Sequence, residues 1–108
     1  MDKTAALNIA RSFSDLVIQL FPVSKVVLFG SQVRGNSHPD SDIDIAVLVC
    51  GLKTDYLDTA TELFRLRKKV NLLIEPILLD ESNDKSGFIA EILRTGEVVY
   101  NSETPTDH

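Results

Sequence analysis

The segment 42–49 restricts the fold more than any other part of the sequence. Its aliphatic side chains occupy both sets of alternating positions, so a strand formed here would be apolar on both faces. Carboxylates occur only among its first three residues, at Asp42 and Asp44. A strand that is apolar on both faces is typical of the centre of a covered sheet. The segment therefore predicts a central strand that is polar only where it begins.

Hydrophobic periodicity divides the rest of the chain into helices and strands. Gly30 closes one expected strand, and Gly96 is expected at the C′ position that ends the last helix. The order of elements predicts an α/β (α+β) domain over residues 1–100, with a small mixed sheet flanked by helices, and a disordered tail at 101–108. The expected helices are residues 4–20, 54–69 and 88–95, and the expected strands are residues 25–29, 42–49, 70–79 and 98–100.

Composition excludes several classes of protein. The 108 residues fit one domain, and their net charge of -5 argues against a non-specific nucleic-acid or anionic-membrane binder. Cys50 is the only cysteine, which excludes an internal disulfide and a cysteine-based zinc site. We therefore expect a reducing, cytoplasmic compartment. The longest apolar run is far shorter than the roughly 20 residues of a membrane-spanning helix, so no membrane partner is expected.

Asp42 and Asp44 are candidate metal ligands. In a strand they would share one face, roughly 7 Å apart at the backbone, where two carboxylates repel each other unless a cation lies between them. Paired metal ions held in this way assist phosphoryl displacement. A calcium-binding EF-hand loop is excluded, because it would need a glycine where Ile45 stands and a glutamate where Gly51 stands.

Gly30, Ser31 and Arg34 form a candidate anion-binding element. The glycine permits a close backbone approach, the serine can donate its hydroxyl to a phosphate, and the arginine can reach the same anion bidentately. A phosphate-binding turn beside two cation-binding carboxylates suits a polyphosphate that carries a chelated metal.

The sequence Gly30-Ser31, ten further residues and then Asp42-Ile43-Asp44 resembles the signature of the minimal nucleotidyltransferases (MNT) of the DNA polymerase β superfamily. Phe29 before the glycine and Arg34-Gly35 after it also fit this pattern. Residues 92–100 resemble the closing helix of that family and its Gly-Glu-x-x-Tyr end. The resemblance covers at least residues 26–100 and implies a polymerase β-like nucleotidyltransferase fold.

The resemblance also implies a reaction. Gly30 and Ser31 would hold the β- and γ-phosphates of ATP, and Asp42 and Asp44 would bind Mg²⁺. A hydroxyl group would attack the α-phosphate, AMP would be transferred and pyrophosphate would leave. Metal and positioned donors supply most of such catalysis electrostatically.

A third carboxylate is the point at which the sequence departs from the common pattern of the family. Many relatives carry an aspartate early in the third strand, where this chain has Asn71. Glu75 is the only acid on the same predicted face, and Ile74-Glu75-Pro76 resembles a subgroup of these small proteins. We expect Glu75 to be the third catalytic and metal-binding residue. Asn71 is the alternative residue for this position. Pro76 predicts an edge strand or a bulge.

The small size leaves no room for an acceptor-binding domain. Stand-alone proteins of this kind resemble the antitoxin half of two-gene modules whose toxin is a helical HEPN-domain ribonuclease. The resemblance implies transfer of AMP onto a tyrosine of that partner, in a complex that could be oligomeric. Two alternatives remain open: an antitoxin that neutralises the toxin by binding alone, and nucleotidyl transfer to a small molecule or an RNA.

Other side chains carry weaker expectations. His38 and His108 are expected to be exposed and not to be ligands, and Cys50 is expected to be a small buried residue. The basic cluster from Arg65 to Lys69 suits the negative end of a helix dipole, with contact to a partner as the less favoured interpretation.

Overall fold

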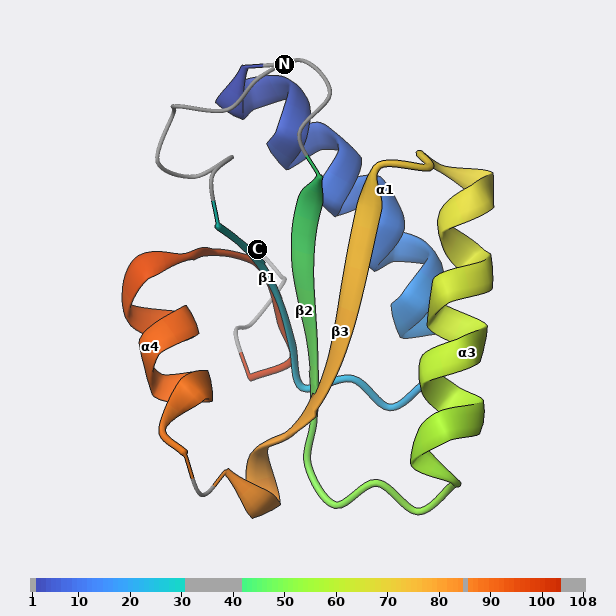
Figure 1. Cartoon of the computed structure of the whole chain (residues 1–108), viewed down its shortest axis with the longest axis vertical. Helices are drawn as coiled ribbons and strands as arrows, with labels where there is room; N and C mark the ends of the chain where they lie inside the picture. Colours follow the sequence, from blue (N-terminus) through green and yellow to red (C-terminus); the bar gives the residue numbers. More distant parts are fainter. Residues whose placement is uncertain (1, 31–41, 85, 104–108) are drawn as a thin grey trace.

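The computed structural model describes residues 2–30, 42–84 and 86–103, and it has helices on both faces of one sheet (Figure 1). Ser31, Arg34, His38 and His108 lie outside the described residues. The elements in chain order are α1 (Lys3–Leu20), β1 (Lys25–Phe29), β2 (Ile43–Val49), α3 (Tyr56–Leu66), the 3-10 turn η1 (Arg67–Lys69), β3 (Ile74–Asp80), the 3-10 turn η2 (Glu81–Asn83), α4 (Phe88–Thr95) and β4 (Glu97–Asn101).

The sheet is mixed, and its strand order is β3-β2-β1-β4. Strand β1 runs antiparallel to both β2 and β4, whereas β2 and β3 are parallel. The parallel pair is joined through α3, which is the crossover that such a connection requires. The predicted fold class, a small mixed sheet flanked by helices, is therefore confirmed.

Side chains on the two faces of the sheet belong to two separate apolar cores. Helices α1 and α3 cover one face, where Phe13 of α1 and Leu63 of α3 are buried against the strands. The shorter helix α4 covers the other face through Ile89 and Ile92. Burial of large aliphatic and aromatic side chains in both layers is worth about 1.5–3 kcal/mol for each side chain, and it fixes the position of the sheet between the helices.

Strand β2 is the buried centre of this arrangement. Every residue from Ile43 to Val49 is buried except Asp44, which is half-buried. Consecutive residues supply opposite cores, with Ile45 facing α1 and α3 and Ala46 facing α4. The central strand predicted from the apolar pattern is confirmed, and the sheet is polar where β2 begins.

Strand β3 lies at one edge of the sheet, as Pro76 predicts. Tyr56 of α3 donates its hydroxyl to the carbonyl oxygen of Leu78 at 2.6 Å, so that carbonyl faces away from β2. Pro76 is two residues earlier and in phase with Leu78, and its missing N–H would have faced the same open edge. The edge therefore has fewer free groups with which another strand could pair.

The third strand is shorter than the expected 70–79, because Asn71 forms a turn before it. The Asn71 side-chain oxygen accepts the N–H of Leu73 at 2.8 Å, and its carbonyl accepts the N–H of Ile74 at 3.2 Å. Local hydrogen bonds of this kind compete with a strand ladder. The strand begins only at Ile74, and Asn71 is not on it.

The expectation that Cys50 is buried is wrong, because the residue is exposed. The chain leaves β2 at Val49 and turns at Gly51, whose φ of +73° suits a glycine. Asp80 at the end of β3 accepts the N–H groups of Gly51 and Leu52 at 3.0 and 2.9 Å. Hydrogen bonds from Ser82 and from these N–H groups hold the pKa of Asp80 well below its usual value. This carboxylate ties the two strand ends together and directs Cys50 outward.

The remaining boundaries differ by a few residues from those expected. The helix expected at 54–69 begins at Tyr56, because the Asp55 side chain caps it, and continues past Leu66 as η1. Strand β4 runs to Asn101, and the Ser102 N–H donates to Ser24 at 2.9 Å. None of the helices in the described ranges has both the length and the apolar character needed to cross a membrane.

Gly96 ends α4 for a different reason from the one expected. Its φ is -92°, not the left-handed value of a C′ glycine. A Cβ at this position would lie 2.7 Å from Val27 Cγ1 and 2.8 Å from the Leu28 oxygen. Close packing of α4 on β1, and not a special backbone angle, explains the glycine.

We therefore expect Gly96→Ala to lower the free energy of unfolding by about 1–3 kcal/mol, since the added methyl group must displace β1 or α4. Urea denaturation followed by circular dichroism measures this loss. Gly87→Ala isolates the other effect, since an added Cβ there meets open space but the positive φ strains the backbone. A Gly96→Ala variant as stable as the wild type would contradict the packing described.

Candidate active site

Three strand ends meet at one end of the sheet. Strand β1 finishes there at Phe29, and β2 and β3 both begin there (Figure 1). Asp44 pairs with Phe29 across the antiparallel ladder and with Glu75 across the parallel one. The fold therefore places Asp44 between the residue that precedes Gly30 on one side and Glu75 on the other. Asp42 immediately precedes β2, two residues before Asp44.

Gly30 is in direct contact with the Asp44 side chain. Its φ of +82° favours glycine, and a Cβ built at this position would overlap Asp44 Oδ2. Both the backbone angle and the space therefore require glycine. The sequence predicts that Gly30 ends a strand and binds phosphate, and the second of these remains a prediction. It does not predict that Gly30 contacts Asp44, because that contact depends on the register of β1 against β2.

The pKa of Asp44 is raised above its ordinary value of 3.8. Partial burial is the largest cause, followed by the negative charges of Asp42 and Glu75. Asp42 and Glu75 are both exposed, so the Asp44 carboxylate lies deepest. The structure brings three predicted site residues, Asp42, Asp44 and Glu75, within electrostatic range of one another.

These side chains fit a divalent cation of the Mg²⁺ type. Carboxylate oxygens are its usual protein ligands, and a bound cation would offset the repulsion that raises the pKa of Asp44. Across residues 2–30, 42–84 and 86–103, no three acidic, histidine or cysteine side chains come together as a metal-binding group. Mg²⁺ is commonly held by one or two carboxylates, with water and substrate phosphates completing its octahedron. The donor set is therefore suited to a metal that arrives with a nucleotide.

The predicted anion-binding element is represented by Gly30 alone. Ser31 and Arg34 lie outside the described residues, and their assigned roles remain predictions. Asn71, the other occupant considered for the third-carboxylate position, is in the turn before β3, where its side chain binds the N–H of Leu73. The residue of β3 in register with Asp44 is Glu75.

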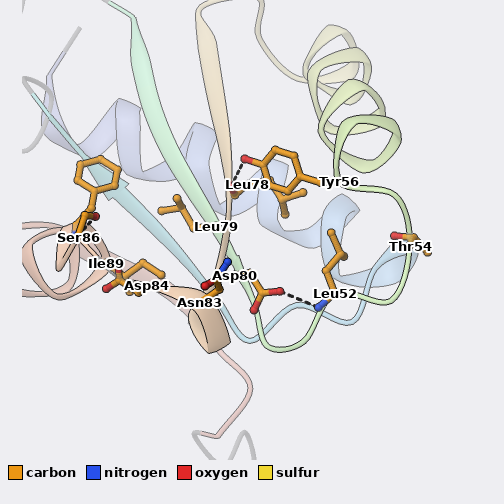
Figure 2. A pocket seen from close by; sticks show the side chains of 11 residues that line it. Leu52, Thr54, Tyr56, Leu78, Leu79, Asp80, Asn83, Asp84, Ser86 and Ile89 are labelled. Carbon is orange, nitrogen blue, oxygen red and sulfur yellow. Dashed lines mark hydrogen bonds between the residues drawn. The ribbon is translucent and has the colours of Figure 1, made fainter.

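Two cavities lie away from these carboxylates. One, of about 650 Å³, is bordered by the ends of β3 and of the β2–α3 connection and by the start of α4, and its lining includes Tyr56, Asp80 and Ile89 (Figure 2). The second, of about 760 Å³, lies between the end of α1 and the start of α3. Neither is lined by a predicted site residue. The predicted site is therefore an open sheet end, not one of these two cavities.

Comparison with known families agrees with this arrangement of residues. The family model described as "Polymerase beta, Nucleotidyltransferase" matches residues 12–105. The chain therefore belongs to the polymerase β nucleotidyltransferase family, and it is an enzyme of the nucleotidyltransferase class. The structural and sequence evidence thus confirm the family predicted from Gly30, Asp42 and Asp44.

Individual proteins resemble this chain in sequence or in fold. A Methanocaldococcus jannaschii protein, a candidate protein adenylyltransferase by its name, is 32% identical over 80 residues, which are 72% of this chain and 79% of that protein. A candidate nucleotidyltransferase from Sulfolobus solfataricus has a similar fold, with a TM-score of 0.69 and 23% identity over 94% of this chain and 86% of that one. A toxin–antitoxin structure with AMP-PNP has a TM-score of 0.64 and 24% identity, covering 89% of this chain and 75% of that one.

The contact between Gly30 and Asp44 can be tested by a double-mutant cycle. Gly30→Ala should lower the free energy of unfolding, because the methyl group strains the backbone and pushes Asp44 aside. We expect part of this loss to disappear in the Asp44→Ala background, where the overlap is removed, with an interaction energy of about 0.5–3 kcal/mol. Urea denaturation of the four proteins supplies the measurement.

Gly51→Ala is the matched control for backbone strain. Its φ of +73° is close to that of Gly30, but nothing lies within 4 Å of the added Cβ. It should be destabilising to the same extent in the wild-type and Asp44→Ala backgrounds. Additive effects of Gly30→Ala and Asp44→Ala would contradict the contact.

The raised pKa of Asp44 predicts a particular dependence of stability on pH. The folded protein binds a proton at Asp44 more readily than the unfolded chain does, so stability falls as pH rises from 3.8 through the folded-state pKa. Asp44→Asn removes this unfavourable charge. In a chelating buffer, the variant should therefore melt at a higher temperature than the wild type at neutral pH, and the difference should close in acid.

Asp80→Asn is expected to behave in the opposite way, since the pKa of Asp80 is lowered by hydrogen bonds. That variant should melt at a lower temperature at neutral pH, and its deficit should shrink as pH falls below 3.8. Melting curves across this pH range distinguish the two carboxylates. An Asp44→Asn variant less stable than the wild type at neutral pH would contradict the electrostatic account.

Proposed function

We propose that the protein is a Mg²⁺-dependent protein adenylyltransferase that transfers AMP from ATP to a tyrosine of a HEPN-domain ribonuclease toxin, and so acts as its antitoxin. The placement of Asp44 between Gly30 and Glu75 is the observation that carries the proposal. It supports a metal–triphosphate site because one half-buried carboxylate is flanked by two acids and by a glycine suited to close approach of a phosphate.

The relatives support the choice of donor and acceptor. The Methanocaldococcus jannaschii relative carries the name of a protein adenylyltransferase, and AMP-PNP, an ATP analogue, is present in one of the toxin–antitoxin structures of similar fold. A second toxin–antitoxin structure, of MntA-HpeT with two Asp-to-Glu substitutions, has a TM-score of 0.57 and 20% identity over 95% of this chain and 76% of that one. These similarities favour a toxin partner with an acceptor side chain.

In the proposed reaction the carboxylates of this chain divide the work. Asp42 and Asp44 would hold Mg²⁺, which when bound neutralises charge on the triphosphate, and Glu75 is the third acid of the site. Gly30, Ser31 and Arg34 bind the β- and γ-phosphates. Glu75 is exposed on the edge strand and accepts the proton of the incoming tyrosine hydroxyl.

The bonds exchanged follow from this placement. The tyrosine oxygen forms a new bond to the α-phosphorus of ATP, and the bond from that phosphorus to the bridging oxygen of the pyrophosphate breaks. Pyrophosphate leaves with the electron pair, while the partner retains AMP as a phosphodiester on its tyrosine. The contribution of this chain is mainly to position the two reactants and to stabilise negative charge.

Mass spectrometry of the partner tests the proposal. The protein is incubated with Mg-ATP and with the HEPN-domain protein of the same genome, and we expect the partner to gain the mass of one AMP on a tyrosine while pyrophosphate is released. Asp42→Asn and Asp44→Asn should each slow the transfer by at least about 100-fold, because each removes a charge that holds the metal. Chelation of divalent ions should stop it.

Asp84→Asn is a control carboxylate variant, since Asp84 is exposed beside the cavity at the other end of the sheet. It should transfer AMP at the wild-type rate. Inhibition of the toxin without any mass gain, surviving in both aspartate variants, would instead identify an antitoxin that works by binding alone. Transfer of AMP to an RNA or a small molecule with an unmodified partner would contradict the proposed acceptor.

A further inference from the structure

The end of α3 and the turn after it form an exposed apolar and basic surface, which we call the α3 tip. Its central residues belong to the last turn of α3, to η1 and to the turn before β3. They are Phe64, Arg65, Arg67, Lys68, Lys69 and Leu72.

Large apolar side chains are unusually exposed on this side of the molecule. Phe64 is 45% exposed and Leu72 is 63% exposed, and Leu57, seven residues before Phe64 on the same helix face, is 72% exposed. Single exposed apolar residues are common, but neighbouring ones often mark a protein interface.

Arg67 joins the apolar residues into one platform. Its guanidinium carbon lies 3.9 Å from the centre of the Phe64 ring, and Nη1 donates to the carbonyl oxygen of Leu72. The arginine thus holds the aromatic ring and the turn before β3 in a fixed relation. Side chains that are already held in place in the free protein lose less conformational entropy when a partner binds.

The charge of the α3 tip is opposite to that of the whole chain. The net charge of the protein is -5, yet four of its 11 basic residues fall between Arg65 and Lys69. Arg65 is 3.8 Å from Glu62, whereas Lys68 and Lys69 have no acidic group within salt-bridge distance in the described ranges. A concentrated positive patch on an acidic protein is suited to an acidic partner surface.

The α3 tip lies at the same end of the sheet as the carboxylates. Figure 1 shows that α3 finishes near the point where β3 begins, and the short connection includes Leu72. Glu75 follows Leu72 by three residues and pairs with Asp44. A protein bound to the α3 tip would therefore lie beside the predicted active site.

We propose that the α3 tip is the docking surface for the acceptor protein, which presents acidic and apolar side chains to it. The inference rests on the proposed function and adds where the acceptor binds. Exposed Phe64 and Leu72 among the cations favour a protein over RNA, because aromatic and arginine side chains are typical of protein interfaces and the acidic chain repels a polyanion. Docking here brings the acceptor hydroxyl to Glu75 and Asp44.

The test compares binding with nucleotide affinity. The HEPN-domain protein of the same genome is immobilised, and its affinity for wild type, Lys68→Glu/Lys69→Glu and Leu72→Ser is measured by biolayer interferometry at several salt concentrations. We expect the double charge reversal to weaken binding at least tenfold and to reduce its salt dependence, and Leu72→Ser to weaken it by a smaller factor. Calorimetry with Mg-ATP should give wild-type affinity for both variants.

Lys53→Glu is the matched control, because Lys53 is an exposed lysine in the connection between β2 and α3, at the opposite end of the molecule. It should bind the partner as the wild type does. Asp44→Asn separates the proposed AMP transfer from the proposed docking. This variant should lose AMP transfer and still bind the partner with wild-type affinity.

Three results would overturn the docking proposal. They are unchanged affinity of the Lys68→Glu/Lys69→Glu variant, an equal loss in Lys53→Glu, and no binding of the wild type. Loss of affinity for a single-stranded RNA 20-mer, with partner binding unchanged, would assign the surface to nucleic acid instead. Wild-type docking through the α3 tip without AMP transfer would overturn only the proposed activity.

Discussion

The half-buried carboxylate of Asp44 is the constraint on which the rest of the site depends. It stands in the most buried strand of the sheet, where burial first, and then the charges of Asp42 and Glu75, raise its pKa. Such a charge is costly unless a cation accompanies it. The Asp44 side chain fits beside the end of β1 only because Gly30, the next residue after β1, has no Cβ. Stability is thus reduced locally where a metal and a triphosphate would restore it.

The two ends of the sheet have different roles. At one end, Asp80 accepts backbone N–H groups of the β2–α3 connection and fixes the strand ends by ordinary hydrogen bonds. At the other end, the negative charges of Asp42 and Glu75 act on the half-buried Asp44 carboxylate. Between the two ends, apolar side chains pack on both faces of the sheet and fix the register of β1, β2 and β3. The strand ends that carry the site are thus positioned by packing on both faces of the sheet.

The open position of the carboxylate site bears on how a second protein could reach it. The proposed carboxylate site is formed at strand ends and not within either of the two cavities described, so a second protein can approach it directly. The α3 tip would add contact area beside the proposed catalytic residues. In this view Arg67 fixes the docking platform, while Glu75 at the neighbouring edge strand faces the acceptor.

The sequence by itself determined the central strand, the edge position of Pro76 and the family, because apolar alternation, a missing N–H and the Gly30–Asp44 spacing are local properties. It did not determine that Asn71 lies in a turn, that Cys50 is exposed or that Gly96 is required by packing. The exposure of Cys50 and the packing of Gly96 depend on contacts between segments distant in the chain. The Asn71 turn is instead formed by local hydrogen bonds, which compete with a strand in a way that alternation of apolar residues does not reveal. Tertiary structure alone decided that Glu75 pairs with Asp44, since strand register is set by both buried faces and not by any one strand.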